Sequence, residues 1–220
     1  MGKVNFPEKE KWLEILAVLL TGILKFVLMD EFGFRLLFIT GACLFWLLFI
    51  LTKYIKNPKV LSRWGFRKHD FRKSMLALLP YALIFVAGII IYGLASGSAI
   101  VNWHIIPVLI FYPIWGTIQQ FMTAGLVAGN LKTISTIKIS DSQIGLLTAL
   151  LFSLVHYPSV PLMLYTFIME YIFIRVYFKW GNLWSLGLYH GLVSGIFLSF
   201  VSGRDLWNEL LGSSAFSFLH

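Results

Sequence analysis

The chain has 220 residues, of which 58% are hydrophobic and only 13% are charged. Average soluble domains carry about 25% charged residues, so this composition excludes an ordinary soluble domain and indicates an integral membrane protein. The formal net charge of +8 would also suit a nucleic-acid-binding protein. In membrane proteins, however, basic residues concentrate in cytoplasmic loops, and we expect no nucleic-acid partner.

Apolar stretches, taken in chain order, predict an all-α fold: a polytopic bundle of about seven transmembrane helices forming a single domain over residues 1–220. A helix needs roughly 20 mostly apolar residues to cross the hydrocarbon of a bilayer. The candidate helices are residues 12–29, 34–52, 75–95, 104–127, 144–157, 160–178 and 183–201. Mixed charge precedes the first of them and no small-residue cleavage site follows it, so we expect a retained helix and no signal peptide.

The distribution of Lys and Arg predicts a cytoplasmic N-terminus and an outside C-terminus, because short cytoplasmic loops collect basic residues. In this orientation most of the 18 Lys and Arg residues are cytoplasmic. Residues 53–74 form the longest basic cytoplasmic loop, with Lys53, Lys56, Lys59, Arg63, Arg67, Lys68, Arg72 and Lys73. Tyr54, Trp64, Phe66 and Phe71 are interleaved with them, so we expect a helix or hairpin that lies against anionic lipid headgroups; a solvated loop is the alternative. The compact chain lacks retention and glycosylation-rich segments, which favours a bacterial inner (plasma) membrane.

Few ionisable residues lie at membrane depth, where each costs several kcal/mol unless it is paired or hydrated. Glu14 and Lys25 lie near opposite ends of the first helix, and we expect their side chains to snorkel to the interface. Glu170 lies midway along the sixth helix. Arg175 is not at the same-face spacing of three or four residues, so Glu170 needs a partner on another helix or a proton. A neutral, packed carboxyl and a site residue both remain open.

Four polar residues at membrane depth stand on three helices: Gln119, Gln120, His156 and His190. Their depths allow them to meet in one cavity that opens to the cytoplasmic side. Two imidazoles with Glu170 offer fewer ligands than zinc usually takes, so we expect no cofactor, and zinc is the less favoured alternative. Cys43 is the single cysteine, which excludes an intrachain disulfide and a cysteine-based metal site.

Three short motifs contain these residues in order: Gln119-Gln120-Phe121-Met122-Thr123-Ala124, Phe152-Ser153-Leu154-Val155-His156 and His190-Gly191-Leu192-Val193-Ser194. Their order, spacing and membrane setting resemble the CPBP family, also called Abi or CAAX-protease-like intramembrane peptidases. That family carries E-E-x-x-x-R, F-x-x-x-H and H-x-x-x-N/D. The resemblance covers residues 75–201, which we predict to be a CPBP-like core.

The resemblance implies endoproteolysis in the membrane, with roles that fall on particular residues here. Gln119 takes the position of the general base, His156 that of the residue orienting water, and His190 with Ser194 the oxyanion position. A neutral amide cannot accept a proton, whereas a general base contributes typically 10²- to 10⁴-fold to a rate. The second Glu and the Arg of the family's first motif would form an ion pair. Gln120 and Ala124 stand at these two positions here, so both charges are absent together and no unpaired buried charge is left.

Three hypotheses follow for the function. The first is an altered CPBP-like endopeptidase that cleaves membrane-associated peptide or protein termini, with His156 alone or Glu170 as a replacement base. The second is a pseudoenzyme that binds the apolar segment of a partner protein in the same cavity. The third is a proton-linked transporter that uses Glu170, for which discontinuous helices around Glu170 would be expected. The first is the leading prediction, and its partners are a membrane-embedded or membrane-anchored substrate and the lipid bilayer.

Overall fold

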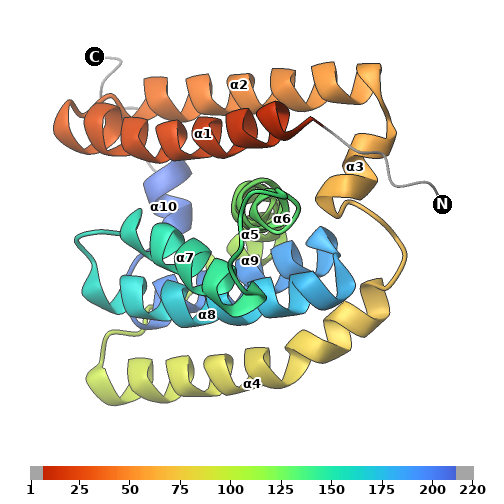
Figure 1. The fold of residues 1–220 in the computed structure, drawn as a ribbon. Helices are drawn as coiled ribbons and strands as arrows, with labels where there is room; N and C mark the ends of the chain where they lie inside the picture. The colour runs from red at the N-terminus through yellow and green to blue at the C-terminus, as the bar shows by residue number, and fades with distance from the viewer. Residues whose placement is uncertain (1–6, 212–220) are drawn as a thin grey trace. The chain divides into compact units, whose positions relative to one another are not determined.

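The computed structural model describes residues 7–211, and these form helices joined by short connections, with no strand among them (Figure 1). Six spans are long and apolar enough to cross a membrane: Glu8–Glu31, Leu37–Lys56, Phe71–Ser96, Ile105–Leu131, Val160–Trp180 and Leu183–Phe200. Asp141–Leu154 is a shorter apolar helix. The predicted polytopic helical bundle is confirmed, and the protein is an integral, multi-pass membrane protein.

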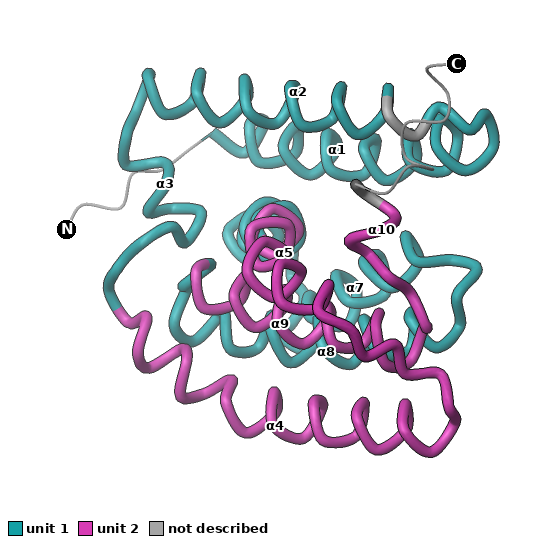
Figure 2. The backbone as a smooth tube through the Cα atoms, turned by 180° about the vertical axis from the view of Figure 1, so that it is seen from behind, with its two compact units in different colours: residues 1–69, 121–183 teal, residues 70–120, 184–220 magenta. Residues whose placement is uncertain are grey.

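The chain divides into two compact units (Figure 2). Unit 1 comprises the chain as far as His69 together with residues 121–183, and unit 2 comprises residues 70–120 and the chain from Trp184 onward. The elements of unit 1 are α1 (Glu8–Leu24), η1 (Lys25–Glu31), α2 (Arg35–Lys56), α3 (Lys59–Trp64), η2 (Phe121–Ala128), α6 (Gly129–Leu131), α7 (Asp141–Leu154) and α8 (Val160–Trp180). Those of unit 2 are α4 (Phe71–Ser96), α5 (Ile105–Gln120), α9 (Leu183–Phe200, from its second residue) and α10 (Leu206–Leu211).

Helix α7 begins and ends earlier than the predicted span 144–157. Its N-cap is Ser140, whose hydroxyl accepts a hydrogen bond from the Gln143 backbone N–H at 3.2 Å, while the Gln143 side chain accepts from the Ser140 N–H at 2.8 Å. This reciprocal capping box satisfies two donors that the first turn would leave unpaired. The apolar pattern alone did not show this start, although the S-x-x-Q spacing is its sequence signature.

In unit 1, α7 and α8 pack side by side as an antiparallel pair (Figure 1). Near one end of the pair, the Ser153 hydroxyl donates to the backbone carbonyl of Met163 at 2.8 Å. Toward the other end, a Cβ on Gly145 would lie 3.2 Å from the Tyr171 ring. These two contacts fix the register between the helices.

In unit 2, α5 and α9 run antiparallel with their backbones in contact. A Cβ on Gly187 would lie 2.0 Å from the Thr117 hydroxyl oxygen, and one on Gly191 would lie 2.3 Å from Pro113 Cα. On the facing helix, a Cβ on Gly116 would lie 2.7 Å from the Gly187 carbonyl oxygen. Small residues allow this close approach, which is the usual way that membrane helices associate without a hydrophobic driving force.

Helix α4 runs parallel to α9 in the same unit. Near the start of both helices, the buried hydroxyls of Ser74 and Ser185 are hydrogen-bonded at 2.5 Å. Near their ends, Gly93 lies so close to Phe200 that a Cβ would meet its carbonyl oxygen at 2.6 Å. Helix α9 is therefore held by α5 and by α4 within unit 2.

Residues 53–74 include a short helix, α3, between the end of α2 and the start of α4. Helix α2 extends to Lys56, α3 follows at Lys59, and α4 begins at Phe71. The expectation that Trp64 faces lipid headgroups is wrong: its ring is fully buried, stacked 5.8 Å from Phe49 and edge-on at 5.0 Å to Phe121. Aromatic neighbours inside unit 1 offer this indole more apolar contact area than the membrane interface would.

Candidate functional site

Unit 2 brings together two of the predicted site residues, Gln120 at the end of α5 and His190 on α9. Gln120 Nε2 lies 3.1 Å from His190 Nδ1, and both side chains are buried. An amide nitrogen only donates hydrogen bonds, so Nδ1 accepts, and the neutral ring carries its proton on Nε2. His190 therefore presents an N–H donor from its second nitrogen.

Ser194 and Gln119 lie beside this pair in unit 2. Ser194 follows His190 by four residues on α9, the spacing that puts two side chains on one helix face, and it is buried. Gln119 precedes Gln120 and is half-buried. This unit thus contains hydrogen-bond donors at His190 and Ser194, but no carboxylate at the two Gln positions of the first motif.

The first motif crosses from an α-helix into a π-helix. Regular α5 ends at Gln120, and the wider turns of η2 begin at the next residue. Such π-segments occur frequently at functional sites. Ala124, at the arginine position of the family motif, is fully buried, and a Cβ on its neighbour Gly125 would lie 3.2 Å from the Trp64 carbonyl oxygen. The packing of η2 leaves no open space for an arginine side chain at position 124.

Unit 1 holds His156 in the opposite tautomer. His156 Nδ1 lies 2.8 Å from the Phe152 carbonyl oxygen, one turn back along the chain. A carbonyl only accepts, so the Nδ1 nitrogen carries the proton of the neutral ring and the Nε2 lone pair remains a proton acceptor. The F-x-x-x-H spacing was recognised from the sequence, but the role of the Phe152 carbonyl was not. Only the folded end of α7 shows which group the ring meets.

Glu170 is fully buried on α8 in unit 1. In the register of this pair it lies level with Gly145, next to Tyr171. His156 is eleven residues from Gly145, which at 1.5 Å per residue corresponds to roughly 16 Å along the helix axis. This separation makes Glu170 a poor partner for His156, and its role in the site stays a prediction.

Helix α8 bears on the transporter hypothesis. It is a continuous α-helix over Val160–Trp180, so the break that a transporter site around Glu170 would require is missing from that helix. Within residues 7–211, no group of three or more His, Cys, Asp or Glu side chains is placed to hold a metal ion.

Taken with the helical multi-pass fold, the motif order is consistent with CAAX-protease-like membrane proteins. The family described as Type II CAAX prenyl endopeptidase Rce1-like matches residues 101–196 of the chain, which confirms the resemblance to the CPBP family. The matched range contains all three motifs, from Gln119 to Ser194. No curated protein and no solved structure matches the chain.

Proposed function

We propose that this protein is a CAAX-protease-like intramembrane endopeptidase that acts on membrane-associated peptide or protein termini, with His156 as its proton acceptor. The observation that carries the proposal is the hydrogen bond from His156 Nδ1 to the Phe152 carbonyl. It reserves the Nε2 lone pair for a water molecule. Gln119 and Gln120 cannot take a proton, so turnover is slow compared with a site that has glutamates there.

In this mechanism His156 Nε2 removes a proton from water as the water oxygen bonds to the scissile carbonyl carbon. The carbonyl oxygen becomes an oxyanion, to which His190 Nε2–H and the Ser194 hydroxyl donate. The C–N bond then breaks, and the proton on His156 passes to the leaving amine.

The test uses the full chain in lipid nanodiscs with a peptide that ends in a prenylated CAAX sequence. Mass spectrometry follows the cleaved peptide. We expect slow cleavage that falls at least 100-fold in His156→Ala. His69→Ala, which removes an exposed imidazole elsewhere in unit 1, is the matched control and should cleave at the wild-type rate. Equal rates in both variants would exclude His156 as the base.

A second candidate function is non-catalytic binding of an apolar partner segment. It is favoured by Gln120, because the amide of Gln120 fixes His190 as a hydrogen-bond donor. A peptide carbonyl can accept the hydrogen bond that His190 then offers. The same assay separates the two candidates, because a binding protein retains the prenylated peptide intact. Retention that is weakened by His190→Ala, without any product in the wild type, would favour this function.

The cytoplasmic N-terminus and a bacterial inner membrane belong to the same proposal. The orientation is supported by the bias of Lys and Arg toward one set of connections, and the bacterial membrane by the compact chain without retention or glycosylation-rich segments. Attachment of a reporter enzyme at each end of the chain tests the orientation, which predicts a cytoplasmic reporter at the N-terminus and an external one at the C-terminus.

A further inference from the structure

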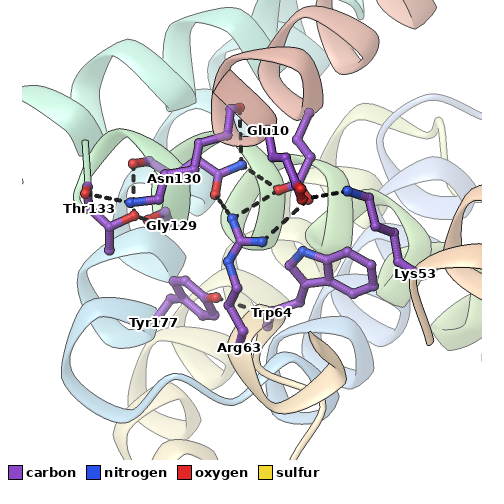
Figure 3. A network of polar contacts seen from close by, with 10 residues as sticks. Glu10, Lys53, Arg63, Trp64, Gly129, Asn130, Thr133 and Tyr177 are labelled. Carbon is purple, nitrogen blue, oxygen red and sulfur yellow. Dashed lines mark hydrogen bonds and ion pairs between the residues drawn. The ribbon is translucent and has the colours of Figure 1, made fainter. Parts of the chain in front are cut away.

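Arg63, in the basic segment, points into unit 1 (Figure 3). It lies 3.2 Å from the Glu14 carboxylate and donates to the Asn130 side-chain oxygen at 2.5 Å. Asn130 in turn donates to Glu14 at 2.7 Å. The expectation that Glu14 snorkels to the interface is therefore wrong: its side chain is buried, because an arginine and an amide from distant parts of the chain satisfy its oxygens.

Two more basic residues of the segment are also bound inside unit 1. Lys53 forms an ion pair of 2.7 Å with Glu10 on α1 (Figure 3). Arg67 donates from Nε to the Gly181 backbone carbonyl at 2.7 Å. The charges of Lys53 and Arg63 are thus matched by carboxylates on α1. Arg67 stabilises the end of α8 through its hydrogen bond to Gly181.

The remaining lysines between residues 53 and 69 do not bind other side chains or carbonyl groups in the described part of unit 1 in this way. Lys56, Lys59 and Lys68 are exposed, and none of their side chains forms a hydrogen bond or ion pair with a residue that the structure describes. They flank α3, since Lys56 ends α2, Lys59 begins α3, and Lys68 follows the turn at Gly65. Their positive charge is uncompensated within unit 1.

Helix α3, which carries Lys59, is anchored in the core of unit 1. Its residues Val60 and Trp64 are fully buried. In the preceding turn of α2, Tyr54 is 44% and Ile55 78% exposed, so an aromatic ring and a large aliphatic side chain lie at the surface next to the lysines. Aromatic residues of this kind are enriched at the boundary between membrane and water.

We propose that Lys56, Lys59 and Lys68 form a contact surface for anionic lipid headgroups, whereas Lys53, Arg63 and Arg67 serve the fold. The contact is electrostatic, because the tryptophan that could have inserted into lipid is buried in the protein. Each basic residue near an anionic membrane surface contributes about 1 kcal/mol, or roughly fivefold in affinity. The proposal does not depend on whether the protein cleaves peptides.

The test measures lipids retained by the purified full-length protein, using native mass spectrometry with equimolar phosphatidylserine and phosphatidylcholine. The wild type should retain phosphatidylserine preferentially, and less of it as salt rises. In the triple variant Lys56→Gln, Lys59→Gln and Lys68→Gln, affinity for phosphatidylserine should fall roughly 100-fold. The single variant Lys59→Gln should lose roughly fivefold, which provides a readout if the triple variant does not fold.

The matched control removes the same charge from other exposed positions of unit 1, with Lys138→Gln, Arg175→Gln and Lys179→Gln. It should retain phosphatidylserine like the wild type. An equal loss in both triple variants would mean that net charge alone attracts the lipid, and would overturn the proposal. So would full competition by inorganic phosphate at millimolar concentration, because the surface would then bind free phosphate and not a membrane headgroup.

Discussion

The two motif histidines differ in tautomer because each meets a different local partner. His190 receives a hydrogen bond from an amide nitrogen of Gln120, which leaves its proton on Nε2. His156 donates to the Phe152 carbonyl, which leaves its Nε2 as an acceptor. The imidazole of His190 can therefore donate a hydrogen bond to a negatively charged oxygen, and that of His156 can accept a proton. Hydrolysis of an acyl bond requires both functions.

Gln120→Glu should reverse the tautomer of His190. A carboxylate accepts hydrogen bonds, so the Nδ1 atom would become the donor and the neutral ring would lose its proton from Nε2. Nitrogen-15 NMR of labelled histidine distinguishes the two tautomers directly. Gln120→Asn, which keeps an amide nitrogen but shortens the side chain, is the control. An unchanged His190 spectrum in Gln120→Glu would show that the amide does not set the tautomer.

Gln119→Glu should raise peptide cleavage about 10²-fold, because it places a proton acceptor at the position where the family has its general base. Initial rates in the nanodisc assay measure the effect. Gln119→Met is the control, since it keeps the length of the side chain without a carboxylate, and it should not gain activity. If Gln119→Glu also fails to gain activity, position 119 does not face the reacting water.

At the scale of elements, α1 lies outside the family-matched range 101–196 but is built into unit 1. Glu14 joins it to α3 through Arg63 and to α6 through Asn130 (Figure 3). A second buried contact runs from Lys11 to the backbone carbonyl of Thr133 at 2.7 Å. The segment after η2 is thus held by the N-terminal helix.

Glu14→Ala should destabilise the protein by about 3 kcal/mol, because it leaves the mostly buried Arg63 without its counter-charge. Reversible unfolding in mixed micelles measures the free energy. Lys25→Ala is the control: it breaks an ion pair with Asp30 that is more exposed, for which we expect a loss below about 1 kcal/mol. Similar losses in both variants would contradict a special role of the buried network.

Gly191→Ala should separate α5 from α9, because the new Cβ would meet Pro113 Cα at 2.3 Å and backbone atoms cannot move aside cheaply. Overpacking of this kind typically costs 1–3 kcal/mol, and we expect it to weaken the bond between Gln120 and His190. Thermal unfolding and the histidine spectrum report the two effects. Gly195→Ala, on the same helix, meets its nearest atom at an ordinary 3.4 Å and should behave like the wild type.

At the scale of the whole molecule, the chain passes between its two units three times, after His69, Gln120 and Leu183. Two of these crossings lie at the first motif and at the start of the helix that carries the third. Gln119 and Gln120 of the first motif and the whole third motif consequently belong to unit 2, whereas Phe121–Ala124 of the first motif and the whole second motif belong to unit 1. Figure 2 shows the two units in different colours. The hydrogen bond between Gln120 and His190 lies within unit 2.

Local properties of the sequence determined the membrane setting, the helical class and the motif order. The length of an apolar run decides whether a helix can cross a bilayer, and motif spacing is read directly along the chain. Six of the seven predicted transmembrane helices correspond to spans of sufficient length, and the seventh, Asp141–Leu154, is a shorter apolar helix. The family resemblance was predicted on the same local basis. The N-cap of α7 at Ser140 could also have been predicted from the sequence, because a capping box is a local pattern.

The tertiary structure alone decided which partner each polar group meets. The burial of Glu14 depends on Arg63 and on Asn130, more than a hundred residues away, and no periodicity in the first helix can indicate them. In the same way, Trp64 faces protein instead of lipid, and Gln120 selects the tautomer of His190 across a contact between two helices. These choices follow from which residues pack together, because burying a polar group is favourable only when a matching group is already in place.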